Sequence, residues 1–144
     1  MSIIYQYEAK VVLKVSRNII VEEFLNYEHM KEWQPTLKEV KLVKGKWQEE
    51  GHIVHLVYLG KNKQEMMMEE KIESLSLPHK IINTYTVGSV CNTNTSYFQS
   101  FGADTMWTME VEFHFEEEPK GTKEMFQRQT ERSMREFKRY IESL

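Results

Sequence analysis

The sequence predicts an α+β fold in which a long C-terminal helix lies over a curved antiparallel sheet. Seven strand-like stretches follow one another along most of the 144 residues, with turn residues between them. A short helical insert follows the first stretch, and residues 122–144 change to a helical period. A curved sheet held by a terminal helix usually leaves a hollow, so this order of elements predicts an internal cavity.

The composition indicates a single domain without a nucleic-acid or membrane partner. The net charge of −3 is close to balanced, so neither nucleic acid nor an anionic membrane is expected as the main partner. The single cysteine, Cys91, cannot form an internal disulfide, which favours a reducing compartment. Residues 1–14 do not resemble a secretion signal, and no apolar run approaches the roughly 20 residues that span a bilayer. We therefore expect one domain over residues 1–144 in the cytoplasm, without integral membrane contact.

The first elements can be placed from local patterns. A strand is expected over residues 5–13, where apolar and polar side chains alternate. Asn18 can cap a short helix over residues 19–26, and a second turn is expected over residues 28–33 before Pro35. These two turns would form a short helix pair ahead of the second strand.

Strand propensity and turn residues predict the rest of the sheet. The expected strands cover residues 37–44, 52–59, 64–77, 80–87, 92–101 and 105–115. Gly88 and Ser89 suit a two-residue hairpin turn, because glycine takes positive φ at the first central position. Residues 119–121, Pro-Lys-Gly, end the sheet.

The last segment has one side at helical spacing, formed by Phe126, Thr130, Ser133, Phe137, Tyr140, Ile141 and Leu144. At about 1.5 Å per residue this helix would be roughly 33 Å long and could cross a whole sheet. Thr130 and Ser133 lie between the two phenylalanines. Such small residues in mid-helix indicate either close packing or space left for a ligand.

Hairpin register predicts which side chains face the interior. An even-numbered loop near Lys61 would bring together Ile53, His55, Val57, Leu59, Met66, Met68, Glu70 and Ile72. This set is more apolar than the opposite one and is expected to point inward, although a bulge would reverse the assignment. His55 and Glu70 would then lie within one diagonal neighbour of each other.

Polar side chains are also expected on the inner face of the later strands. The predicted hairpins place Asn83, Tyr85, Asn92, Asn94 and Ser96 on one face with Phe98, Trp107, Met109 and Val111. A buried amide without a hydrogen-bond partner costs roughly 1–3 kcal/mol. These amides must therefore either pair with each other or line a wet cavity.

Three segments of the chain resemble one known family. They are residues 21–33 (VEEFLNYEHMKEW, followed by Gln-Pro), residues 70–82 (EKIESLSLPHKII) and residues 137–142 (FKRYIE). Together with the element order they resemble the START/Bet v1-like superfamily, in particular its polyketide-cyclase/dehydrase-like branch. The resemblance implies a helix-grip fold with an apolar cavity for lipids, sterols, polyketides or hormones. It also implies a range of activities, since the family includes carriers, sensors, aromatase/cyclases and activators of a chaperone ATPase.

The leading hypothesis is that the chain binds a hydrophobic small molecule, such as a lipid, polyketide or aromatic metabolite, without covalent chemistry and without a cofactor. The candidate ligand-binding residues are Trp33, His55, Val57, Met66, Met68, Glu70, Asn83, Tyr85, Asn94, Ser96, Phe98, Trp107, Met109, Phe126, Thr130, Ser133 and Phe137. The methionines would form a deformable wall, the amides and hydroxyls would bond ligand oxygens, and the aromatic rings would supply apolar area. The alternative role is core packing for the methionines and tryptophans, and hydrogen bonding between neighbouring strands for the amides and hydroxyls.

Two other functions stay open at this point. A cyclase or dehydratase, hence a lyase or isomerase, would use His55 and Glu70 as an acid/base pair. An interaction module like the chaperone-ATPase activators would act through its outer surface, and a homodimer is also open. No metal site is expected because His52 and His55 lie on opposite strand faces, and neither a phosphate-binding glycine loop nor a nucleophile elbow is present.

Overall fold

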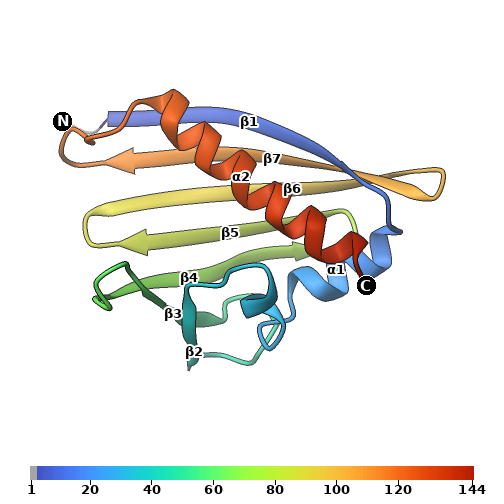
Figure 1. Ribbon diagram of the computed structural model, residues 1–144, viewed down its shortest axis with the longest axis horizontal. Coiled ribbons are helices and arrows are strands. Elements are labelled where there is room, and N and C mark those ends of the chain that lie inside the picture. The colour runs from blue at the N-terminus through green and yellow to red at the C-terminus, as the bar shows by residue number, and fades with distance from the viewer. Residues whose placement is uncertain (1–2) are drawn as a thin grey trace.

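The computed structural model describes residues 3–144 and confirms the predicted α+β fold (Figure 1). The strands are β1 (Ile3–Leu13), β2 (Leu37–Lys44), β3 (Ile53–Leu59), β4 (Glu65–Ser76), β5 (Lys80–Val87), β6 (Val90–Phe101) and β7 (Asp104–Phe115). They form one antiparallel sheet in the order β1-β7-β6-β5-β4-β3-β2. Strands β2 to β7 are therefore successive neighbours, and β1 closes the far edge beside β7.

Three helical segments complete the fold. They are α1 (Arg17–Phe24), the 3-10 turn η1 (Met30–Glu32) and α2 (Lys123–Glu142). Helix α1 begins one residue before Asn18, so Asn18 lies inside the helix and Ser16 takes the N-cap position. Thr122 caps α2, since its side chain accepts a hydrogen bond from the backbone N–H of Met125 at 3.2 Å. Among residues 3–144, no helix is both long and apolar enough to cross a membrane.

The later hairpins have the predicted register. Val87 pairs with Val90, so Gly88 and Ser89 form the two-residue turn, with Gly88 at φ +56°. Across β6 and β7 the paired residues of the inner face include Asn94 with Val111, Ser96 with Met109, and Phe98 with Trp107. The amides and hydroxyls of these strands therefore share a face with the core aromatics.

The β3–β4 hairpin differs from the prediction. Leu59 pairs with Glu65, so the loop consists of residues 60–64, an odd number that reverses the face of β3. The inward pairs are Val54 with Glu70, Leu56 with Met68, and Tyr58 with Met66. His55 and Val57 consequently lie on the outer face, where the His55 ring contacts Glu69 (Nε2 to Oε1, 3.3 Å). The predicted inward position of these two residues is wrong, whereas that of Met66, Met68 and Glu70 is confirmed.

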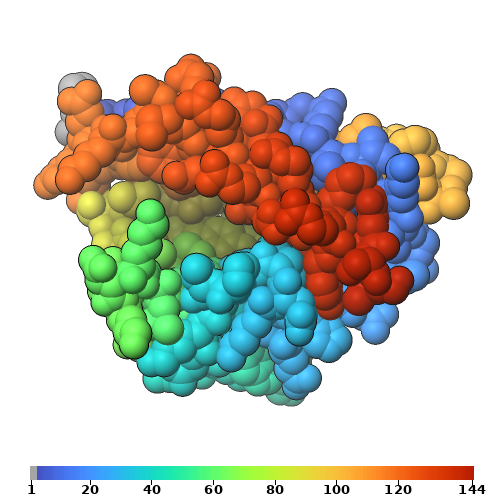
Figure 2. All heavy atoms as spheres, in the orientation of Figure 1, coloured from blue at the N-terminus to red at the C-terminus, as the bar shows by residue number. Residues whose placement is uncertain are grey.

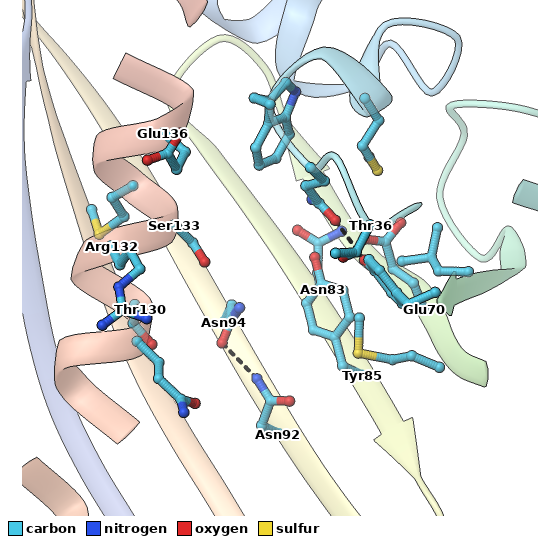
Figure 3. Close-up of a pocket in the computed structure, with 18 of the residues that line it drawn as sticks. Thr36, Glu70, Asn83, Tyr85, Asn92, Asn94, Thr130, Arg132, Ser133 and Glu136 are labelled. Carbon is cyan, nitrogen blue, oxygen red and sulfur yellow. Dashed lines mark hydrogen bonds between the residues drawn. The ribbon is translucent and has the colours of Figure 1, made fainter. Parts of the chain in front are cut away.

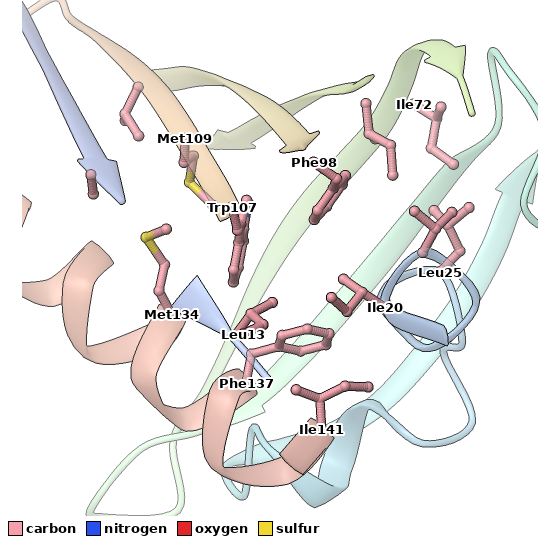
Figure 4. Close-up of a cluster of buried hydrophobic side chains, with 14 residues drawn as sticks. Leu13, Ile20, Leu25, Ile72, Phe98, Trp107, Met109, Met134, Phe137 and Ile141 are labelled. Atoms are coloured by element: carbon pink, nitrogen blue, oxygen red, sulfur yellow. The ribbon is translucent and has the colours of Figure 1, made fainter. Parts of the chain in front are cut away.

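The C-terminal half of α2 is fixed by a cluster of buried hydrophobic side chains that includes Phe137 and Trp107 (Figure 4), and by further aromatic rings around Phe137. Phe137 is fully buried, and its ring centroid lies 5.0 Å from that of Trp33, 5.5 Å from Trp107 and 5.9 Å from Phe24. The interplanar angles are 73–80°, the edge-to-face geometry that aromatic pairs favour. This cluster joins α2 to α1, to the segment after η1 and to the sheet.

The N-terminal half of α2 is fixed by a second aromatic cluster. The Phe126 ring centroid lies 5.0 Å from Phe113, 5.3 Å from Phe115 and 5.7 Å from Tyr5. The helix is thus anchored at two separate points on the sheet. Between them, Met134 is buried in the core, whereas Thr130 and Ser133 are smaller side chains.

The first anchor should carry a large part of the stability. Phe137→Ala would remove a fully buried ring and is expected to lower the free energy of unfolding by about 3–5 kcal/mol. Phe101→Ala is the matched control, because that ring is 50% exposed and its removal should change stability little. Urea denaturation followed by circular dichroism measures both. A loss below about 1 kcal/mol for Phe137→Ala would show that the cluster does not fix the helix.

Candidate functional site

A cavity of about 800 Å³ lies between α2 and the concave face of the sheet. Its size falls in the range of small-molecule sites, about 300–1,000 Å³, and most of its lining is apolar. Figure 2 shows the hollow beside α2, bordered by the segments drawn in cyan and green. Residues 34–36 and the β3–β4 loop contribute Gln34, Pro35, Thr36, Gly60 and Gln64 to the opening. The hollow that the element order predicts is therefore present.

Most of the candidate residues line this cavity. They are Trp33, Met66, Met68, Glu70, Asn83, Tyr85, Asn94, Trp107, Met109, Phe126, Thr130 and Ser133. Ser96, Phe98 and Phe137 do not: all three are buried, and Ser96 accepts a hydrogen bond from Trp107 Nε1 at 3.0 Å. His55 and Val57 lie on the outer face, as described above. Ligand binding by the twelve lining residues stays a prediction.

Glu70 is the most unusual of the lining residues. Its side chain projects from β4 and only 4% of the residue is exposed. Tyr27, from the segment after α1, donates a hydrogen bond to the carboxyl group, and Tyr85 is the partner of Glu70 on β5. Burial raises the pKa of Glu70 above its ordinary value, and the hydroxyl groups of the two tyrosines oppose this rise in part. A carboxyl group is thus held inside an otherwise apolar wall.

A chain of hydrogen bonds leads from Glu70 to the loop before β3. The backbone N–H of Gln48 donates to His52 Nδ1 at 3.0 Å, which leaves Nε2 to donate to Tyr27 Oη, also at 3.0 Å. The Tyr27 hydroxyl in turn donates to Glu70. Burial lowers the pKa of His52, which favours the neutral ring that this chain requires. The chain fixes the hydroxyl that supports the buried carboxyl group.

Local backbone geometry positions His52. Gly45 has φ +82°, and a Cβ atom at this position would lie 3.1 Å from His52 Cα, so glycine permits both the turn and the close approach. The Trp47 ring covers the network from outside, 5.6 Å from Tyr27 between centroids. Sequence reasoning missed Tyr27 because it lies in an irregular segment where alternation predicts no direction, and it missed His52 because the predicted strand over residues 52–59 placed that side chain on the outer face. Their residue types are the one available signal, because tyrosine and histidine side chains can form the hydrogen bonds that a buried acid needs.

The cavity wall also contains polar atoms that lack partners. Asn83 Oδ1 and Trp33 Nε1 are buried and have no hydrogen-bond partner among residues 3–144. By contrast, Asn92 Nδ2 donates to Asn94 Oδ1 at 2.8 Å. The inward amides were expected either to pair with each other or to line a cavity, and both occur. Asn92 and Asn94 pair with each other, whereas Asn83 faces the cavity. An unpaired buried amide costs roughly 1–3 kcal/mol, which a ligand group could recover.

Figure 3 separates the polar groups into two sides of the cavity. Glu70, Asn83 and Tyr85 come from β4 and β5, whereas Thr130, Arg132, Ser133 and Glu136 come from α2 across the hollow. Thr130 already bonds to the sheet through Tyr7 (Oγ1 to Oη, 2.6 Å). The Thr130 hydroxyl is therefore already paired, whereas Asn83 Oδ1 on the β4–β5 side has no partner among residues 3–144.

The predicted acid/base pair of His55 and Glu70 does not form. The two side chains project from opposite faces of the sheet, because the odd-numbered loop reverses β3. His55 is instead a partly exposed neighbour of Glu69. Within the described range 3–144, no three side chains of His, Cys, Asp or Glu gather so as to hold a metal ion.

Comparisons with known proteins support the fold. No protein-family model matches the chain, and no curated protein does. Among solved structures, Ara h 8.0201 has a TM-score of 0.83 at 11% identity, covering 98% of this chain and 99% of that one. A START superfamily protein from Mycobacterium smegmatis reaches 0.80 at 11% identity, covering 96% and 98%. The major latex-like protein 151 from Panax ginseng reaches 0.75 at 12% identity, covering 95% and 97%.

These similarities extend over whole chains at low sequence identity. The chain therefore has the START/Bet v1-like helix-grip fold, as the three resembling segments predict.

The burial of Glu70 should appear in the pH dependence of stability. Its folded-state pKa is raised above the ordinary value of 4.5, so the folded chain holds this proton more tightly than the unfolded chain. The contribution to stability is full below pH 4.5 and is lost as pH rises toward the folded-state pKa. A glutamine at position 70 does not titrate, so Glu70→Gln does not lose stability in this way. The free energy of unfolding of the variant minus that of wild type should therefore increase as pH rises above 4.5.

Chemical denaturation at several pH values measures the free energy of unfolding of both proteins. Groups that titrate alike in the two proteins cancel when one value is subtracted from the other. Glu69→Gln is the control, because Glu69 lies next to Glu70 on β4 but on the outer face. A difference between Glu70→Gln and wild type that stays constant with pH would contradict the assigned shift.

Proposed function

We propose that the chain binds a hydrophobic small molecule inside the cavity, without covalent chemistry. The observation that carries this proposal is the open, mainly apolar hollow of about 800 Å³ between α2 and the sheet. The START/Bet v1-like fold implies the same class of ligand, namely a lipid, a polyketide or an aromatic metabolite. We further propose that the chain acts as one domain over residues 1–144 in the cytoplasm.

Apolar burial would supply the main driving force. A ligand that buries about 300 Å² of apolar surface gains roughly 7 kcal/mol before the cost of its immobilisation. Met66, Met68 and Met109 line the cavity, and their flexible thioether chains can adapt to ligands of different shape. The polar groups on the β4–β5 side would then set the orientation of the ligand.

The two other functions receive less support. The enzymatic alternative depends on His55 beside Glu70, and these residues lie on opposite faces of the sheet. The interaction module would need a coherent outer surface, but the exposed large apolar side chains come from many separate elements. Among them are Ile4, Ile19, Val43, Trp47, Leu77, Phe101 and Met125.

A tryptophan in the cavity tests the proposal. Ser133 lies on α2 and lines the hollow, so Ser133→Trp should fill space that a ligand needs. Arg135→Trp is the matched control, because Arg135 is exposed two residues further along the helix and does not line the cavity. Fluorescence titration with the neutral dye Nile red should show saturable binding to wild type and Arg135→Trp, and at least about tenfold weaker binding to Ser133→Trp.

The melting temperature of each variant checks that the fold is intact. Absence of saturable dye binding to wild type, or equal binding by folded Ser133→Trp, would overturn the proposal.

A further inference from the structure

We propose that the ligand carries a protonated amino group, which Glu70 receives at the β4–β5 wall of the cavity. This inference rests on the proposed function, because it assigns a chemical class to the molecule in the same hollow. It follows from three observations: an acid without a basic partner, a second acceptor beside it, and the aromatic side chains around both.

Glu70 is a buried acid that lacks a basic partner. It is the one carboxylate buried within residues 3–144, and no lysine or arginine of that range forms an ion pair with it. Arg132 lines the cavity but belongs to α2, on the side opposite Glu70 in Figure 3. His52 contacts Tyr27 rather than the carboxyl group, and burial keeps its ring neutral. A cationic ligand would complete this incomplete pair.

The free hydrogen-bonding capacity beside Glu70 includes acceptors. An ionised carboxylate offers about four acceptor positions, and the hydroxyl group of Tyr27 occupies one of them. Asn83 Oδ1 is a further acceptor without a partner in the described chain. Ile72 pairs with Asn83 and Glu70 with Tyr85, so Asn83 and Glu70 are diagonal neighbours on one face. A primary ammonium group, with three donors and no acceptor, matches this arrangement.

Aromatic side chains surround the same region. Tyr27, Tyr58, Tyr85 and Trp33 all line the cavity, and the Tyr58 hydroxyl is held by Gln34 Oε1 at 2.6 Å. Aromatic rings attract cations through the negative charge of their faces, an effect that strengthens where water is excluded. A carboxylic acid at this wall would meet the opposite conditions, since its charge would face Glu70. An alcohol would donate one hydrogen bond and gain no charge pairing.

Three ligands with the same octyl chain separate these cases. Displacement of Nile red at pH 7.5 by 1-octylamine, 1-octanol and octanoate compares an ammonium, a hydroxyl and a carboxylate on equal apolar bodies. The expected order of affinity is amine, alcohol, carboxylate, with at least about a tenfold difference between the first two. Glu70→Gln should reduce the amine to the affinity of the alcohol, whereas Glu69→Gln on the outer face should keep the wild-type order.

The outcomes distinguish this inference from the proposed function. If the dye binds but octylamine binds no tighter than octanol, or octanoate binds tightest, the ammonium site is overturned. The proposal of a hydrophobic cavity is then unaffected. An amine preference that survives in folded Glu70→Gln also overturns the assignment to Glu70. Absence of dye binding to wild type overturns both proposals. If Glu70→Gln does not fold, the wild-type order of the three ligands decides the matter alone.

Discussion

The anchoring of α2 at two separated points is the constraint on which the cavity depends. Phe137 fixes one half of the helix and Phe126 the other, each within an aromatic cluster that joins it to the sheet. A helix is stiff over this distance, so its middle cannot move down onto the concave sheet. Met134 is buried in the core there, whereas the neighbouring Thr130 and Ser133 are too small to fill the gap. The void therefore results from the position of large and small residues along one helix.

The same scaffold explains how the carboxyl group of Glu70 is held in the buried cavity wall. Desolvation disfavours the charged form of Glu70, and the hydroxyl groups of Tyr27 and Tyr85 offset only part of that cost. Tyr27 is itself held by His52, which depends on the turn at Gly45. Four separate segments thus cooperate to keep one acid in place. Such an arrangement is costly for folding alone, and a ligand that pairs with the acid would offset the cost on binding.

The sequence alone predicts the order and type of the elements, because period, turn residues and caps are local signals. It predicts twelve lining residues for the same reason, since most lie on strands or on α2 where alternation or helical spacing gives direction. The face of β3 depended instead on the number of residues in one loop. That loop contains Lys63 at φ +62°, a conformation that lysine does not signal. Tyr27 and His52 lie in irregular segments, where only tertiary packing determines direction.

The position of the opening follows from the order of the strands. Helix α2 rests on aromatic residues of β1 and β7 at one edge of the sheet, while η1 and the segment after it cover β2 and β3 at the other (Figures 1 and 2). That second cover is fixed to β3, because the Leu59 N–H donates to Thr36 O at 2.9 Å and Tyr58 donates to Gln34. The two covers meet where Phe137 packs against Trp33, and they diverge from there because α2 crosses the sheet diagonally toward β1 (Figure 1). The slot between them leads over β4 and β5, directly to Glu70 and Asn83.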